Sequence, residues 1–306
     1  MPASKLSDSA GEAAVSGASP RVFLDYDQAA LDAAYNQAVY APHSEHVRRR
    51  IASASREVHE RLRPQRIAYG KGEQEKLDWY ATDKAGAPVM LFIHGGAWRR
   101  GTARDNAFAA EVFLDAGVHF VVPDFVWVQD AQDSLRTIAN QLRAATVCTL
   151  KKAAEIGADT SRLYLVGHSS GAHLGGVLLT TDWAAQWQLK SDVFRAATLC
   201  SGMYDLYPVS LSSRREYVPF DDDIVQTLSP QRHIDRLTAP VTLIYGTLET
   251  PEFQRQSRDF TDAVRRAGKQ ARLLEARDYN HFDLKETLAN PYGVFGKAVL
   301  DMLASG

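Results

Sequence analysis

A serine in a short glycine-flanked motif is the residue of this sequence best suited to nucleophilic chemistry. Ser169 lies at the centre of Gly167-His168-Ser169-Ser170-Gly171, between an apolar run at 163–166 and a helix-forming stretch. A sharp turn from strand to helix strains the backbone of the central residue, and flanking glycines remove side chains that would clash there. The positive end of the following helix would stabilise an oxyanion beside that serine. The motif therefore predicts that Ser169 attacks a carbonyl carbon.

A serine hydroxyl becomes a useful nucleophile only when a neighbouring imidazole takes its proton. One chain order in which such triads occur is serine, then acid, then histidine, and His173, His233 and His281 follow Ser169. His173 lies four residues further along the predicted helix, which indicates packing, and His233 precedes a strand instead of following one. His281 follows the last apolar strand and is the predicted base.

The third member of such a triad is a carboxylate that orients the histidine. Glu249 comes soon after the strand expected at 241–245, in the loop where this acid should lie. Glu252 lies three residues further on and is the rival. Because Pro251 turns the chain between them, the two carboxylates should point in different directions. The sequence favours Glu249 and leaves Glu252 as the alternative.

A second glycine-rich turn, His94-Gly95-Gly96-Ala97-Trp98, follows the apolar strand expected at 89–93. Backbone N–H groups in such a turn can face a developing negative charge, and so can the N–H of the residue after the nucleophile. His94 itself is interpreted as structural. We predict an oxyanion hole built from Gly95, Gly96, Ala97 and Ser170.

Several aromatic side chains follow predicted strands and could line a pocket. Such a lining would suit a flat aryl or small acyl substrate, although each ring could equally fill the core. The predicted substrate contacts are five of these aromatic residues and His168, which precedes the nucleophile. They are Trp98, Phe125, Trp127, His168, Tyr204 and Phe282.

Placing these residues together requires a fold in which strands and helices alternate. Strands are expected at 77–81, 89–93, 118–122, 163–166, 196–199, 241–245 and 271–275. Helices are expected at 106–116, 135–156, 171–179, 253–267 and 292–303. This alternation predicts the α/β class, with right-handed crossovers and a mostly parallel central sheet covered by helices on both faces.

The chain is expected to form one domain over 21–306 after a mobile tail at 1–20. A helical leader at 21–64 precedes the core, either as a cap over the pocket or as a surface brace. A long loop excursion is expected at 202–233, between two core strands. Such loops often carry functional residues.

Composition excludes several classes of protein. Across 306 residues, 35 Lys and Arg against 37 Asp and Glu give a net charge of −2, so no global positive field favours nucleic acid or an anionic membrane. Two cysteines, Cys148 and Cys200, exclude a disulfide framework and fit a cytoplasmic location. No apolar run approaches the roughly 20 residues of a membrane span. We expect no metal and no cofactor, and a homodimer is left open.

The two glycine-rich motifs together resemble those of the α/β-hydrolase superfamily, near its hormone-sensitive-lipase-like branch. More narrowly, the chain resembles the arylformamidases, also called kynurenine formamidases. The segments that carry this second resemblance are Tyr26-Asp27-Gln28 with Leu31 and Tyr35-Asn36, the turn at 94–98, and the stretches 134–145, 201–206, 251–253 and 279–283.

The resemblance implies an α/β-hydrolase fold and a cytosolic serine hydrolase that needs no cofactor. It implies removal of formyl from an aryl amide such as N-formylkynurenine, a step of tryptophan catabolism, with carboxylesterase activity common among relatives. Ser169, Glu249 and His281 fall on the catalytic triad of this family.

Two departures from the family pattern leave the natural substrate open. The family more often has Asp where this chain has Glu249, and the related lipases have a third glycine where this chain has Ala97. An arylformamidase and a carboxylesterase of short-chain or aryl esters are both compatible with these motifs. A non-catalytic binding protein on the same scaffold is the alternative from a different class.

Overall fold

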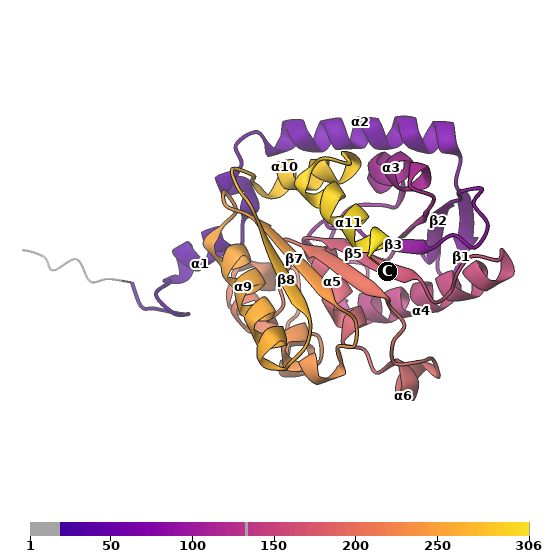
Figure 1. Cartoon of the computed structure of the whole chain (residues 1–306). Helices are drawn as coiled ribbons and strands as arrows, with labels where there is room; N and C mark the ends of the chain where they lie inside the picture. The colour runs from indigo at the N-terminus through magenta and orange to yellow at the C-terminus, as the bar shows by residue number, and fades with distance from the viewer. Residues whose placement is uncertain (1–18, 132–133, 306) are drawn as a thin grey trace, which may run out of the picture.

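The computed structural model describes residues 19–131 and 134–305, and eight strands in these ranges form one sheet (Figure 1). The strand order is β1-β2-β4-β3-β5-β6-β7-β8. β1 and β2 pair antiparallel with each other and β2 pairs antiparallel with β4, whereas β3 to β8 run parallel. The predicted α/β class with a mostly parallel sheet is confirmed. The bounds are β1 Gln65–Ala68, β2 Lys76–Tyr80, β3 Val89–Ile93, β4 His119–Pro123, β5 Leu163–His168, β6 Ala196–Cys200, β7 Val241–Gly246 and β8 Ala271–Ala276.

Helices cover both faces of this sheet, and strand β3 shows why its sequence is apolar throughout. Successive side chains of a strand point to opposite faces. Val89, Leu91 and Ile93 pack in one core with α4 (Ser134–Glu155), α5 (Ser170–Leu179) and α9 (Pro251–Arg266). Met90 and Phe92 pack in the other core with α2 (Ser44–Leu62), α3 (Ala110–Asp115) and α11 (Val294–Ala304). A strand buried on both sides has no polar face.

The five predicted helices are all present, with ends shifted by a few residues. The helix expected at 106–116 is divided into the 3-10 turn η2 (Arg104–Ala109) and α3. Among the short elements that escaped prediction are the edge strand β1, α6 (Trp183–Trp187) and α10 (His281–Glu286). β1 is mostly exposed, so its sequence carries little apolar pattern.

Residues 202–233 do not form the loop that was expected. They contain α7 (Leu206–Leu211), η3 (Ser213–Glu216), α8 (Asp222–Thr227) and η4 (Pro230–Arg232), which η5 (Ile234–Arg236) follows. Asp205 and Asp221 cap α7 and α8 by accepting hydrogen bonds from Tyr207 N and Ile224 N. These short helices are set by their caps and by burial, not by a long amphipathic pattern.

The N-terminal leader is helical and packs mainly against other helices. It consists of α1 (Gln28–Ala34), η1 (Gln37–Tyr40) and α2. Figure 1 shows α2 along the top of the molecule, above α10 and α3, and it buries Val47, Ile51 and Val58 there. The predicted tail at 1–20 lies outside the described residues except for its last two. Within the described part of the chain, no helix is both long and apolar enough to cross a membrane.

Candidate active site

Ser169 forms the whole turn between β5 and α5. Its backbone has φ 59° and ψ −127°, a strained conformation for a residue with a side chain. A Cβ atom on Gly167 would lie 2.6 Å from the carbonyl oxygen of Gly171, and one on Gly171 would lie 2.1 Å from that of Ile93. Both glycines are therefore required for this turn, which holds the Ser169 hydroxyl above the carboxyl edge of the sheet.

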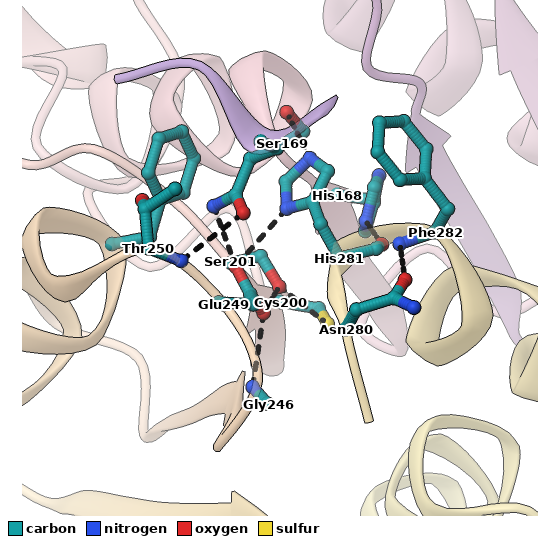
Figure 2. A network of polar contacts seen from close by, with 12 residues as sticks. His168, Ser169, Cys200, Ser201, Gly246, Glu249, Thr250, Asn280, His281 and Phe282 are labelled. Carbon is teal, nitrogen blue, oxygen red and sulfur yellow. Dashed lines mark hydrogen bonds and ion pairs between the residues drawn. The ribbon is translucent and has the colours of Figure 1, made fainter. Parts of the chain in front are cut away.

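The structure brings Ser169, His281 and Glu249 into one hydrogen-bonded chain (Figure 2). The Oγ atom of Ser169 lies 2.8 Å from Nε2 of His281, and Nδ1 of His281 lies 3.0 Å from Oε2 of Glu249. The three residues are 8%, 4% and 1% exposed, respectively. With the carboxylate accepting at Nδ1, Nε2 is free to take the hydroxyl proton. The arrangement is suited to nucleophilic attack by Ser169.

Both oxygens of the buried Glu249 carboxylate are hydrogen-bonded. Oε1 accepts from Ser201 Oγ at 2.5 Å and from the backbone N–H of Gly246 at 2.9 Å. Oε2 accepts from Gln37 Nε2 at 3.0 Å, in addition to His281. A buried carboxylate is costly unless its oxygens have such donors. These contacts fix the acid in one orientation toward the histidine.

Ser201 and Gln37 are functional candidates that sequence reasoning missed. Ser201 directly follows β6, which is the neighbour of β7, so its place at the same sheet edge was a signal that could have been used. Gln37 comes from the leader, 212 residues before Glu249, and also accepts a hydrogen bond from Thr250 N at 3.2 Å. No local pattern marks it, because its role arises only when the leader packs.

The rival acid, Glu252, faces a different environment. It accepts from the Tyr35 hydroxyl at 2.7 Å and from Nε and Nη2 of Arg255 at 2.8 and 2.7 Å. Thr250 is the N-cap of α9 and Pro251 is its first residue, so Glu252 lies inside the helix while Glu249 lies in the turn before it. Pro251 stands between the two residues, and their carboxylates contact different partners.

The turns after β7 and β8 are packed closely enough to bring acid and histidine together. A Cβ on Gly246 would lie 2.1 Å from the carbonyl oxygen of Tyr279, and that oxygen accepts from Leu248 N at 3.1 Å. Asn280 caps α10 by accepting from the N–H groups of Phe282 and Asp283. His281 is the first residue of this short helix, which fixes the direction of its ring.

The glycine-rich turn after β3 passes directly beside the nucleophile. Gly96, Ala97 and Trp98 have φ values of 132°, 55° and 61°, and a Cβ on Gly95 would lie 2.9 Å from the Cβ of Ser169. Among residues 19–131 and 134–305, the N–H groups of Gly96, Ala97 and Ser170 find no protein acceptor. Free backbone donors beside a nucleophile are what an oxyanion requires.

Two further histidines near the site are neutral. Burial, helped by His281 and Lys285, lowers the pKa of His168 well below its usual value, and its Nε2–H donates to the carbonyl of His281 at 3.1 Å. Burial lowers the pKa of His173 to about 4; it accepts from Trp98 Nε1 and donates to the carbonyl of Leu228. Both rings therefore act as fixed hydrogen-bonding groups.

Ser169 and His281 open into a cavity of about 640 Å³. His168 and Phe282 line it, whereas the other four predicted contacts do not. Trp98 packs edge-on against His173, Phe125 stacks on His94 at 4.5 Å between ring centroids, and Tyr204 stacks on Phe260 at 4.4 Å. Trp127 is 36% exposed and donates to the carbonyl of Gly101. These four side chains point away from the cavity, which could not be predicted from their positions after strands.

The strained serine turn, its histidine and carboxylate neighbours, and the mostly parallel sheet are those of the α/β-hydrolase fold. This chain is a serine hydrolase of that fold. Residues 77–199, which include Ser169 and the turn at 94–98, match the BD-FAE family model.

Comparison with known proteins indicates which kinds of hydrolase this chain resembles. The kynurenine formamidase of Danio rerio is 28% identical over 244 residues, covering 78% of this chain and 80% of that enzyme. An isoprenylcysteine α-carbonyl methylesterase of Arabidopsis thaliana is 22% identical over 250 residues, covering 71% of this chain and 56% of that protein. The chain therefore resembles kynurenine formamidases and esterases, and its fold is that of the α/β-hydrolases.

Solved structures show the same fold. A Silicibacter protein described as a thioesterase superimposes with a TM-score of 0.78 at 24% identity, over 90% of this chain and 98% of its own. Esterase 2 of Thermogutta terrifontis superimposes with a TM-score of 0.64 at 19% identity, over 79% of this chain and 92% of its own.

Proposed function

We propose that the protein hydrolyses a small aryl formamide, such as N-formylkynurenine, through a covalent formyl-enzyme on Ser169. The observation that carries this proposal is the hydrogen-bonded chain from Ser169 through His281 to Glu249. The formamide substrate is supported by the kynurenine formamidases of Danio rerio and Salmo salar, each 28% identical to this chain.

In the proposed reaction, Ser169 Oγ attacks the formyl carbon while Nε2 of His281 takes the hydroxyl proton. Glu249 stabilises the imidazolium that forms. The N–H groups of Gly96, Ala97 and Ser170 hold the oxyanion, and Gly95 shapes their turn. His281 then returns the proton to the aryl amine, which leaves. Water, deprotonated by the same histidine, attacks the formyl-enzyme and releases formate and free Ser169.

We also propose that residues 21–306 act as one catalytic unit that includes the leader, and that His168 and Phe282 contact substrate. The bond from Gln37 to Glu249 supports the first point, since the leader contributes to the site. Both cysteines are free, which supports a reducing compartment, and we place the protein in the cytoplasm.

A carboxylesterase of short-chain or aryl esters is the second candidate. It is supported by methylesterases among the sequence relatives and by esterases among the structural neighbours. The same residues would cleave an ester, with an alcohol leaving in place of an amine. The two candidates therefore differ in substrate and not in mechanism.

A side-by-side steady-state assay with N-formylkynurenine and para-nitrophenyl acetate tests the proposal. We expect formamide turnover with kcat/KM of about 10⁴ M⁻¹s⁻¹ or more, an ordinary value for an enzyme. Ser169→Ala should fold normally by circular dichroism and lose at least about 10⁴-fold in kcat. Turnover of the ester alone would assign a carboxylesterase, and an active Ser169→Ala variant would remove the proposed nucleophile.

A further inference from the structure

The cavity at Ser169 is lined by an unusual excess of positive charge. Asp105 is the single carboxylate among its lining residues. The cationic side chains that line it come from α2, the turn after β3, η3 and α10, and are Arg48, Arg99, Arg100, Arg214 and Lys285. Low-dielectric walls of one sign concentrate the electric field inside a cleft. A neutral substrate would make no use of this field.

Arg214 is the most deeply buried of these cations, with 9% of its surface exposed. Its Nη1 donates to the Tyr217 hydroxyl at 3.0 Å, and its Nη2 donates to the carbonyl of Tyr35 at 2.9 Å. Its Nε–H has no partner within the described residues, and none of the ion pairs formed by those residues includes Arg214. Burying a charge without a counter-charge is costly. Both hydrogen-bond partners of this guanidinium are neutral, and its other neighbours include the Trp98 and Phe253 rings, with centroids 5.5 and 6.0 Å from Cζ. Its charge is therefore not balanced by an ion pair within the described residues.

A second group of lining cations consists of side chains that repel one another. Lys285 Nζ donates to Asn106 Oδ1 at 2.8 Å, and the Arg48 guanidinium lies 4.5 Å from the Phe282 ring centroid. Burial lowers the pKa of Lys285 to about 8, with Arg48 and Arg100 adding to this effect and Asp105 opposing it. Arg48 also pairs with Glu45. The charge of this group is partly neutralised by Asp105 and Glu45, whereas Arg214 forms no ion pair with any described residue.

We propose that Arg214 is the residue that binds a carboxylate on the leaving group of the substrate. The position on the leaving group rests on the proposed function: a formyl group holds one carbon, so the rest of the substrate occupies the leaving-group side of the cavity. A planar guanidinium suits a carboxylate because it offers parallel N–H donors. Arg48, Arg100 and Lys285, which also line the cavity, add a longer-range attraction.

The test compares two esters with the same scissile bond, para-acetoxybenzoate and its methyl ester. After correction for their spontaneous hydrolysis rates, wild type should prefer the carboxylate by about tenfold or more in kcat/KM, the range of a charged hydrogen bond. Arg214→Gln should remove most of this preference. Arg214→Lys, which keeps the charge and loses the planar donors, should retain part of it. Raising the salt concentration should weaken the preference in wild type.

Arg50→Gln is the matched control, because Arg50 lies on the same helix as Arg48 but pairs with Glu286 and does not line the cavity. Its preference should equal that of wild type. Arg100→Gln alters an exposed side chain and should lower the preference about two- to fivefold by reducing the field. The Arg100→Gln variant keeps the proposal testable if Arg214→Gln does not fold. Inhibition of wild type by benzoate at far lower concentration than by benzamide would support it without turnover.

Equal kcat/KM values for the two esters in wild type would overturn the proposal. A preference confined to a carboxylate on the acyl half, seen with para-nitrophenyl hydrogen succinate against its methyl ester, would overturn the leaving-group assignment. The formamide assay stands apart from these. If the carboxylate preference is retained but N-formylkynurenine is not hydrolysed, the formamidase is rejected and Arg214 remains the anion-binding residue. If N-formylkynurenine is hydrolysed but the two esters are cleaved equally well, the formamidase stands and the role of Arg214 is rejected.

Discussion

Two buried glutamates three residues apart, Glu249 and Glu252, show how contacts decide the role of a residue. Glu249 accepts from Ser201, the Gly246 backbone and Gln37, and its remaining contact is His281. Among the residues that the structure describes, Glu252 accepts only from Tyr35 and Arg255. The first carboxylate serves the proposed chemistry, and the second joins the leader to α9.

Replacing each glutamate by glutamine should therefore have a different effect. In Glu249→Gln the imidazolium loses its counter-charge, and kcat should fall about 10³- to 10⁴-fold. Glu252→Gln weakens a buried ion pair, so kcat should change less than about fivefold while the free energy of unfolding falls by about 1–3 kcal/mol. Steady-state kinetics and urea unfolding of both variants check this. If Glu252→Gln is inactive and Glu249→Gln is active, the acid of the triad is Glu252 and not Glu249.

At the scale of elements, the leader joins parts of the chain that the sheet does not connect. Gln28 Nε2 donates to the carbonyl of Leu211 and Asp32 accepts from Ser213 N, which attaches α1 to the segment at 202–233. Tyr35 accepts from Arg214, and Gln37 contacts Glu249. Residues of both α1–η1 and α2 line the cavity. The leader is thus a wall of the site as well as a brace.

Gln37 should act as a positioning residue for the acid. In Gln37→Ala, Glu249 loses one donor and the Thr250 N–H loses its acceptor. We expect kcat to fall about tenfold, the effect of one lost hydrogen bond, with KM little changed. Gln28→Ala removes a leader contact away from the triad and should keep kcat. Steady-state kinetics and thermal unfolding of both variants test this expectation. If Gln37→Ala and Gln28→Ala lose the same stability and the same fraction of kcat, Gln37 has only a structural role.

Much of this arrangement could be predicted from the sequence, because its parts are local. The turns around Ser169 and at 94–98 are defined by their glycines, and Pro251 separates Glu249 from Glu252. The role of Gln37, the burial of Arg214 and the directions of Tyr204 and Phe125 depend on how distant segments pack. The helices at 202–233 were missed because they are short and depend on caps. Periodicity needs longer segments to be visible.

The whole molecule is nearly neutral, with a net charge of −2, yet its charges are distributed unevenly. Positive side chains gather around the cavity at Ser169. Burial lowers the pKa of His94, His168 and His173, the last to about 4. The total charge therefore describes poorly what a ligand meets at the active site.

These histidines should make the fold sensitive to acid. In the unfolded chain a histidine titrates near pH 6.5, roughly its unperturbed value, so below that pH the unfolded state binds protons that the folded state excludes. The free energy of unfolding should fall as pH decreases from about 7 toward 5, by up to about 1.4 kcal/mol per pH unit for each histidine. Urea unfolding across this range measures the slope, and His173→Gln should flatten it. A stability that is constant or rises toward pH 5 would contradict the expectation.

The contact between Gln37 and Glu249 joins residues 212 positions apart. A refolding chain can complete its parallel sheet before this distant connection closes, because contacts of high sequence separation are slow to form. Recovery of full activity then reports the formation of this contact between the N-terminal helices and the turn after β7. Spectroscopic signals from the sheet report only the earlier collapse, so the two signals would date different stages of renaturation.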